Sequence, residues 1–145
     1  MFKLILLNIY IQHLPTNQMQ ILLDTNFILT CVKQKIDFPE IINQCTTEPV
    51  EWLLPQDVLN ELGNLKDRPH MKVPDKQAAT LSFQILQTIN PKIINLPGKN
   101  PNIDIKIVNY ILDKPIVLAT LDKNLKSRVA NKILTIRGKK NLELL

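Results

Sequence analysis

The chain contains 145 residues, 45% of them apolar, so it is long enough to bury one core and short for two domains. Its two cysteines and two histidines do not have zinc-site spacing, which excludes zinc binding of the usual kind and leaves oxygen atoms as the ligands of any metal. The net charge is +5 at pH 7 although thirteen acidic residues are present, and the excess of basic residues is unevenly distributed.

The first eighteen residues begin with an apolar stretch that resembles a signal peptide, but Asn8, Gln12 and His13 interrupt it. No small-residue cleavage site follows, and no apolar run reaches the length of a membrane span. We therefore expect a cytoplasmic protein without a membrane partner. Residues 1–18 are interpreted as an N-terminal extension, for which an extra strand, a flexible segment and the product of an upstream start codon remain open. Residues 19–145 are expected to form the folded domain.

Short apolar runs alternate with longer segments of helical periodicity. Strands are predicted at Gln20–Leu23, Glu51–Leu54, Ile93–Leu96, Ile116–Ala119 and Leu134–Ile136. Helices are predicted at Phe27–Lys33, Glu40–Cys45, Gln56–Lys66, Asp75–Ile89, Ile103–Leu112 and Lys123–Ala130, with Asn102 and Asp122 as the caps of the last two. This alternation predicts an α/β domain with a central, mostly parallel sheet of about five strands and helices on both faces.

Four acidic residues occur where ligands collect in such a fold. Asp24 ends the first apolar run and Asp122 comes just past the fourth, while Glu61 and Asp104 fall early in two helical segments. Taken singly, the two aspartates after strands could be helix caps and the other two acids could be exposed helical residues. Acids that converge at the carboxyl ends of parallel strands indicate instead a site for a hard cation.

Carboxylates of this kind suit Mg²⁺ or Mn²⁺, which can activate water and neutralise charge on a phosphodiester without any histidine. Seven basic residues and no acid lie between Lys123 and Lys140, directly after the fourth acid. Such a segment can attract a phosphate backbone or can simply be a solvated helix face and turn. Beside a carboxylate cluster it favours a nucleic-acid substrate, and the backbone contacts that we expect are Lys123, Lys126, Arg128 and Arg137.

Four segments together resemble the ordered motifs of PIN-domain nucleases: DTNFIL (24–29), VLNEL (58–62), the DxxI element (104–107) and TLDKNLK (120–126). The resemblance covers about residues 19 to 144. It implies a PIN-like domain that cleaves RNA as an Mg²⁺- or Mn²⁺-dependent endoribonuclease. It also implies that Asp24, Glu61, Asp104 and Asp122 are both the catalytic residues and the metal ligands. Thr25, Asn26 and Thr120, at the polar positions beside the first and fourth motifs, would orient them.

Within the family, LLPQDVLNEL and ILTIRGKKNLELL are most similar to small archaeal PIN proteins related to the small-subunit processome nuclease. That subgroup implies a role in precursor rRNA processing, whereas VapC-type toxins of toxin-antitoxin pairs are the competing subgroup. The implied partner is RNA, with a homodimer and an antitoxin left open. The archaeal subgroup often has a second acid directly after the third motif acid, and Ile105 occupies that position here, so the number of metal ions is open.

Two rival classes differ in their residue requirements. A haloacid-dehalogenase-like phosphatase would have an acid where this chain has Asn26, and a response-regulator receiver would have paired early acids that are absent after the first strand. A non-catalytic RNA-binding protein with a PIN-like fold would be indicated by loss of a motif acid, and none is lost. An endoribonuclease is therefore the leading prediction.

Overall fold

A computed structural model describes residues 18–145, so the expectation for residues 1–17 lies outside the described range. Six strands form one sheet: β1 (Met19–Leu23), β2 (Val50–Pro55), β3 (Lys92–Ile94), β4 (Ile116–Ala119), β5 (Ile133–Arg137) and β6 (Asn141–Leu144). Their order across the sheet is β3-β2-β1-β4-β5-β6. The first five strands are parallel to one another, and β6 pairs antiparallel with β5.

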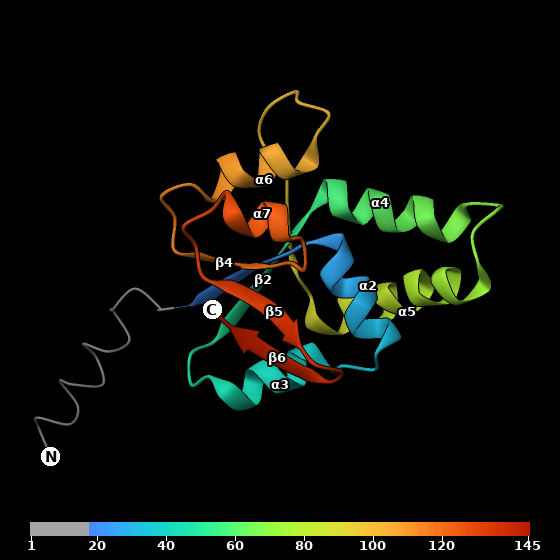
Figure 1. The fold of residues 1–145 in the computed structure, drawn as a ribbon, viewed down its shortest axis with the longest axis horizontal. Coiled ribbons are helices and arrows are strands. Elements are labelled where there is room, and N and C mark those ends of the chain that lie inside the picture. The colour runs from blue at the N-terminus through green and yellow to red at the C-terminus, as the bar shows by residue number, and fades with distance from the viewer. Residues whose placement is uncertain (1–17) are drawn as a thin grey trace, which may run out of the picture.

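Helices cover both faces of this sheet (Figure 1). They are α2 (Thr25–Lys33), α3 (Phe38–Cys45), α4 (Gln56–Asp67), α5 (Val73–Ile89), α6 (Ile103–Ile111) and α7 (Lys123–Ser127). One apolar core joins the sheet to helices α2 to α5, and a second core joins the opposite face to α6 and α7. The predicted α/β architecture, mostly parallel and covered on both faces, is confirmed.

Strand β1 illustrates why the sheet needs both layers. Ile21 and Leu23 pack in the core under α2 to α5, whereas Leu22 between them packs in the core under α6 and α7. All three side chains are buried, because successive residues of a strand point to opposite faces. A continuous apolar run is therefore the sequence signature of a central parallel strand.

The structure differs from the predicted elements at the end of α7, at both ends of β3 and in an additional strand, β6. Helix α7 ends at Ser127 and not at Ala130, because the Arg128 N–H donates to the Leu125 carbonyl and closes the last turn. Strand β3 begins one residue earlier than predicted and ends at Ile94, where its pairing with β2 stops. Strand β6 was not predicted. It returns along β5 after a turn in which Gly138 has φ +67°, a conformation that suits glycine.

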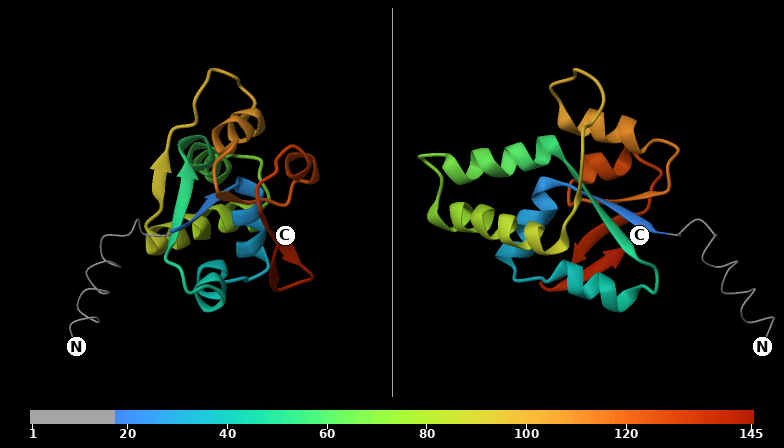
Figure 2. Two further views of the ribbon diagram at one scale, coloured as in Figure 1. Left: turned by 90° about the vertical axis from the view of Figure 1, so that its left-hand side faces the viewer. Right: turned by 180° about the vertical axis from the view of Figure 1, so that it is seen from behind.

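Helices α4 and α5 pack side by side and extend beyond the sheet, as the views of Figures 1 and 2 show. Helix α6 lies at the opposite end of the domain from the turn between β5 and β6. Within residues 18–145, no helix combines the length and the apolarity that crossing a membrane requires.

Candidate active site

Asp24 lies where β1 meets α2, and it acts as the N-cap of that helix. Its backbone N–H donates to the Ala119 carbonyl at 3.0 Å, so the chain leaves β1 beside the end of β4. The side-chain Oδ1 accepts a hydrogen bond from the Thr25 N–H at 2.9 Å, and Oδ2 accepts one from Thr120 Oγ1 at 2.7 Å. These contacts fix both carboxylate oxygens at the carboxyl end of the sheet.

The Asp24 carboxylate is buried, with 8% of the residue exposed. Burial raises its pKa to about 6, and the nearby negative charges of Asp104 and Glu61 raise the pKa as well. The hydrogen bonds from Thr120 and Thr25 favour the charged form and lower the pKa, but they do not offset the burial. Burial is therefore the main reason that the charged form of Asp24 is disfavoured, and the neighbouring acids add to it.

Asp122 is connected to Asp24 through one hydroxyl group. Thr120 Oγ1 donates to Asp24 and accepts a hydrogen bond from the Asp122 N–H at 3.1 Å. The Asp122 carboxylate caps α7 by accepting from the Asn124 and Leu125 N–H groups at 2.9 and 3.2 Å. The cap that the sequence predicts at Asp122 is thus present, and it orients this acid at the same sheet edge.

Glu61 reaches the site from the second turn of α4. Its Oε2 accepts a hydrogen bond from Thr25 Oγ1 at 2.9 Å. Thr25 is buried and follows Asp24, so one residue holds both acids: its backbone N–H donates to Asp24 and its hydroxyl donates to Glu61. Asn26 has a different contact, since its Oδ1 accepts from the Leu121 N–H at 3.3 Å and connects the first motif to the fourth.

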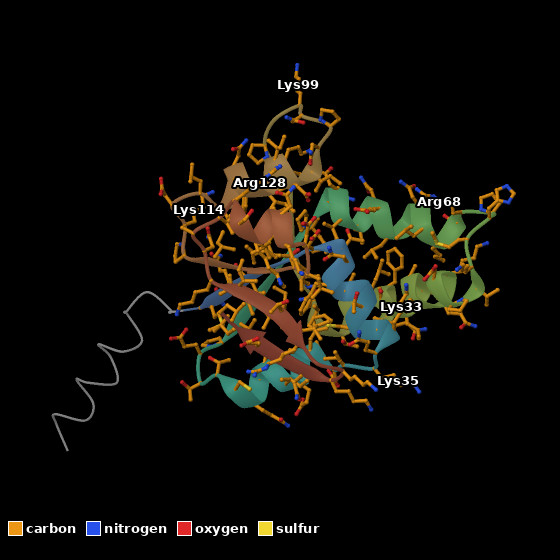
Figure 3. The ribbon with its side chains drawn as sticks, viewed as in Figure 1. Lys33, Lys35, Arg68, Lys99, Lys114 and Arg128 are labelled. Atoms are coloured by element: carbon orange, nitrogen blue, oxygen red, sulfur yellow. The ribbon has the colours of Figure 1, made fainter. Side chains whose placement is uncertain are left out.

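Asp104 enters from α6, whose N-cap Asn102 accepts a hydrogen bond from the Asp104 N–H at 2.9 Å. Burial raises the pKa of Asp104, and the charge of Asp122 raises it further. The guanidinium of Arg128 lowers the pKa of the same carboxyl, so this cation acts on the acid site. Figure 3 shows Arg128 between α6 and α7.

All four acids line one pocket of about 260 Å³. A larger groove of about 790 Å³ contains none of these acids, so the site is identified by its carboxylates and not by its volume.

Apolar side chains that the sequence analysis did not identify complete the wall of the acid pocket. Leu29 and Leu65 stand four residues after Thr25 and Glu61 on their helices. Residues at this spacing share a face of a helix, so the sequence could have identified both leucines as neighbours of the site. The lining residues are Asp24, Thr25, Asn26, Leu29, Glu61, Leu65, Ile103, Asp104 and Asp122.

The chemistry of these groups fits a hard divalent cation, since carboxylate oxygens are the preferred ligands of Mg²⁺ and Mn²⁺ and the charges of Asp104 and Glu61 both act on Asp24. In the structure, however, the four carboxylates are farther apart than the ligands of one bound ion. In the part of the chain that the structure describes, no three acidic, histidine or cysteine side chains are grouped closely enough to hold an ion. Glu61 is turned to a hydroxyl and Asp122 to backbone amides. Because these carboxylates are bonded to other donors, shared binding of an ion would require their side chains to rotate.

The four basic residues selected from the sequence do not lie together. Lys123 is exposed at the start of α7 and Arg128 at its end. Lys126 Nζ donates to Thr135 Oγ1 at 2.9 Å, so this ammonium is directed at β5. Arg137 ends β5 near the turn that lies far from α6, and its Nη1 is 3.6 Å from Glu143 Oε1.

Comparison with known proteins also indicates similarity to nucleases. No known family model matches the sequence. Ribonuclease VapC4 of Methanocaldococcus jannaschii is 26% identical over 125 residues, which are 83% of this chain and 92% of that relative. The solved structure of the PIN-domain endonuclease Utp24 is 25% identical, with a TM-score of 0.68, and the likeness covers 86% of this chain and 90% of that one.

A chain of VapBC2 from Rickettsia felis, solved bound to a DNA fragment from their promoter, is similar in fold alone. Its TM-score is 0.57 and its identity 15%, over 82% of this chain and 100% of that one. The PIN-like fold that the motifs predict is therefore confirmed by structures, and the two relatives with higher identity are a ribonuclease and an endonuclease. In fold, and in these likenesses of sequence and structure, the chain is similar to PIN-domain nucleases.

Proposed function

We propose that this protein is a divalent-metal-dependent endoribonuclease that hydrolyses phosphodiester bonds of RNA. One observation carries the proposal: acids from four separate segments line a single pocket, and one of them, Asp24, is buried there. Placing other carboxylates beside a buried one costs stability unless a cation offsets their charge. Such an arrangement is expected where it serves binding or catalysis.

The proposed ligands of the ion are Asp24, Asp104 and Asp122, with Glu61 as a further ligand or as the group that holds the attacking water. When bound, the ion supplies the positive charge that acidifies water and offsets charge developing on the phosphodiester. The Thr25 and Thr120 hydroxyls hold Glu61 and Asp24 by the hydrogen bonds that they donate. In this scheme water attacks phosphorus and one P–O bond of the RNA backbone breaks.

The direct test is RNA cleavage by the purified protein. We expect cleavage with Mg²⁺ or Mn²⁺, loss of cleavage when EDTA removes the ion, and recovery when the ion is restored in excess. Cleavage that continues at the same rate in EDTA would show that the acids do not act through a metal.

For RNA binding we propose the four basic residues named above, with Lys123 and Arg128 as the pair whose effect is simplest to interpret. Lys126 is bonded to Thr135 and Arg137 is close to Glu143, so replacing either changes a protein contact as well. Lys123 and Arg128 stand at the two ends of α7, directly after the motif acid Asp122. A phosphate backbone that passes over α7 would meet both cations.

Replacing both by alanine should weaken RNA binding and flatten its salt dependence, because two phosphate contacts are lost. For single-stranded RNA, the slope of log K against log[salt] should fall in magnitude by about 1.4. The measurement is a binding titration at several salt concentrations, in an Asp24→Asn background to prevent cleavage. The matched control replaces the exposed Lys72 and Lys92, which lie outside the acid pocket. An equal change of slope in the control would refute the assignment.

For the substrate we propose precursor rRNA of the small ribosomal subunit, processed in the cytoplasm. The motif resemblance described above and the likeness to the Utp24 endonuclease support this choice. A VapC-type toxin with an antitoxin partner is the second candidate, favoured by the 26% identity to VapC4. Association of the Asp24→Asn protein with immature small subunits, mapped by RNA crosslinking, would support processing. Growth arrest on expression, relieved by a neighbouring gene product, would support the toxin.

A further inference from the structure

An ion pair connects the two helices that carry Glu61 and Asp104. Lys106, the fourth residue of α6, has its Nζ 2.7 Å from Oδ2 of Asp57, the second residue of α4. Both side chains are largely shielded, with 15% and 29% exposed. Asp57 Oδ2 is removed from solvent and receives no hydrogen bond of standard geometry from the described residues, so the ammonium is its compensating charge.

The pair lies close to the acid pocket on both helices. Glu61 follows Asp57 by four residues and therefore stands one turn further along the same face of α4. On α6, Ile107 is fully buried in the core, and the 100° rotation per residue sets Asp104 and Lys106 on opposite flanks of it. One flank of α6 thus carries a motif acid into the pocket while the other flank is held to α4.

Like charges oppose this arrangement. Glu61 and Asp104 both border the pocket, and both add to the negative charge felt by Asp24. Their repulsion favours movement of α4 and α6 away from each other. The Lys106–Asp57 contact acts in the opposite direction and, being shielded, loses little strength to solvent screening.

We propose that Asp57 and Lys106 are positioning residues that hold α4 and α6 at the separation at which Glu61 and Asp104 can serve one divalent ion. The proposal rests on the metal-dependent function proposed above. Neither residue lines the pocket, so neither is a ligand itself. Their role is to limit how far two ligand-bearing helices can move apart.

Lys106→Met gives a test in which two explanations predict opposite signs. The substitution keeps an apolar stem of similar length but removes a positive charge near the acids. If Lys106 acted only through its electric field, its loss would tighten cation binding. If it positions α6, its loss should weaken Mn²⁺ binding roughly tenfold, as is typical when groups that orient ligands are removed.

Mn²⁺ binding is measured by electron paramagnetic resonance of free Mn²⁺, which needs no RNA and no turnover. Lys106→Arg retains the charge and should stay within about threefold of the wild type. Lys114→Met is the matched control, because this lysine follows α6 at the end away from α4 and contacts Tyr110, 4.1 Å from the ring centroid (Figure 3). It should bind Mn²⁺ as the wild type does.

The double variant Asp57→Asn/Lys106→Met separates positioning from general stabilisation. Removing both charges restores stability relative to Lys106→Met, because no uncompensated charge stays shielded. Thermal unfolding should therefore recover while Mn²⁺ affinity stays roughly tenfold below the wild type.

Each outcome bears on one of two claims. Recovery of Mn²⁺ affinity in the double variant, or unchanged or tighter binding by Lys106→Met, would overturn the positioning role and leave the proposed function intact. Absence of Mn²⁺ binding by the wild type would overturn both.

Discussion

Asp24→Asn should reduce the rate of RNA cleavage at least about a thousandfold at saturating Mg²⁺. The amide has nearly the shape of the carboxylate but lacks its charge, so the pocket loses its most buried acid, which accepts hydrogen bonds from the Thr25 N–H and the Thr120 hydroxyl. Fixed charge inside a site of low dielectric contributes more than the same charge in water. The rate should be measured under single-turnover conditions, so that product release does not hide the chemical step.

A matched control uses the same chemical change outside the pocket. Asp113 lies in the turn after α6 with φ +58°, a conformation that asparagine adopts readily, so Asp113→Asn should fold normally. We expect this variant to cleave RNA at the wild-type rate. If Asp24→Asn and Asp113→Asn cleaved equally well, Asp24 would not be a catalytic residue.

The same Asp24→Asn substitution should stabilise the metal-free protein by about 2 kcal/mol at pH 7. A pKa raised from 3.8 to about 6 corresponds to a cost of about 3 kcal/mol for the charged form, and the amide removes that cost. The amide also has one acceptor fewer for the Thr25 and Thr120 donors, and the lost hydrogen bond destabilises the variant by about 1 kcal/mol. A substitution that removes activity and increases stability is typical of a residue retained for function.

The pH dependence of this effect has a defined sign. Because the folded state raises the pKa of Asp24, the folded protein keeps a proton that the unfolded chain has already lost between pH 3.8 and about 6. The contribution of Asp24 to stability is therefore largest below pH 3.8 and is lost as the pH rises through about 6. The advantage of Asp24→Asn should be full at pH 7 and should shrink by pH 4.

Urea unfolding of both proteins in EDTA, at pH 4 and pH 7, measures this difference directly. The other carboxylates are common to both proteins, so the comparison isolates Asp24 and its immediate neighbours. A stability difference that is the same at the two pH values, or that favours the wild type at pH 7, would contradict the raised pKa of the buried carboxyl.

The sequence predicts the position of the acids well because of how parallel sheets are built. Asp24 and Asp122 follow continuous apolar runs, and such runs mark central strands whose carboxyl ends meet at one edge. Each acid also caps the helix that follows, as the local pattern indicates. Local sequence signals and the alternation of strands with helices were enough to predict where these two acids lie.

Features that depend on how helices pack on the sheet were not accessible from the sequence. Asp57 and Lys106 are far apart in the chain, and their contact depends on the rotation of α4 and α6 about their axes. The hydrogen bond from Thr25 to Glu61 likewise follows from tertiary packing, and it is one reason why the acids do not form a ready ligand group. Helix periodicity gives a face of a helix but no distance between helices.

Strand β6 was missed for a related reason. Its four residues, Asn141–Leu144, have only a short alternating pattern, and none of them is fully buried. Pairing with β5 stabilises the strand through backbone hydrogen bonds, which every residue type except proline can make. The central strands were recognised because their side chains are buried on both faces, a requirement that an edge strand does not have.

The central claim is that acids from four segments share one divalent ion. Anomalous diffraction from a crystal of the wild-type protein soaked in Mn²⁺ tests it most directly, because the signal locates the metal without reference to activity. We predict a peak in the acid pocket, about 2 to 2.3 Å from carboxylate oxygens of Asp24, Asp104 and Asp122. The same soak should give no such peak with Asp24→Asn. A pocket without a peak in the wild type at millimolar Mn²⁺, or a peak that survives the substitution unchanged, would contradict the claim.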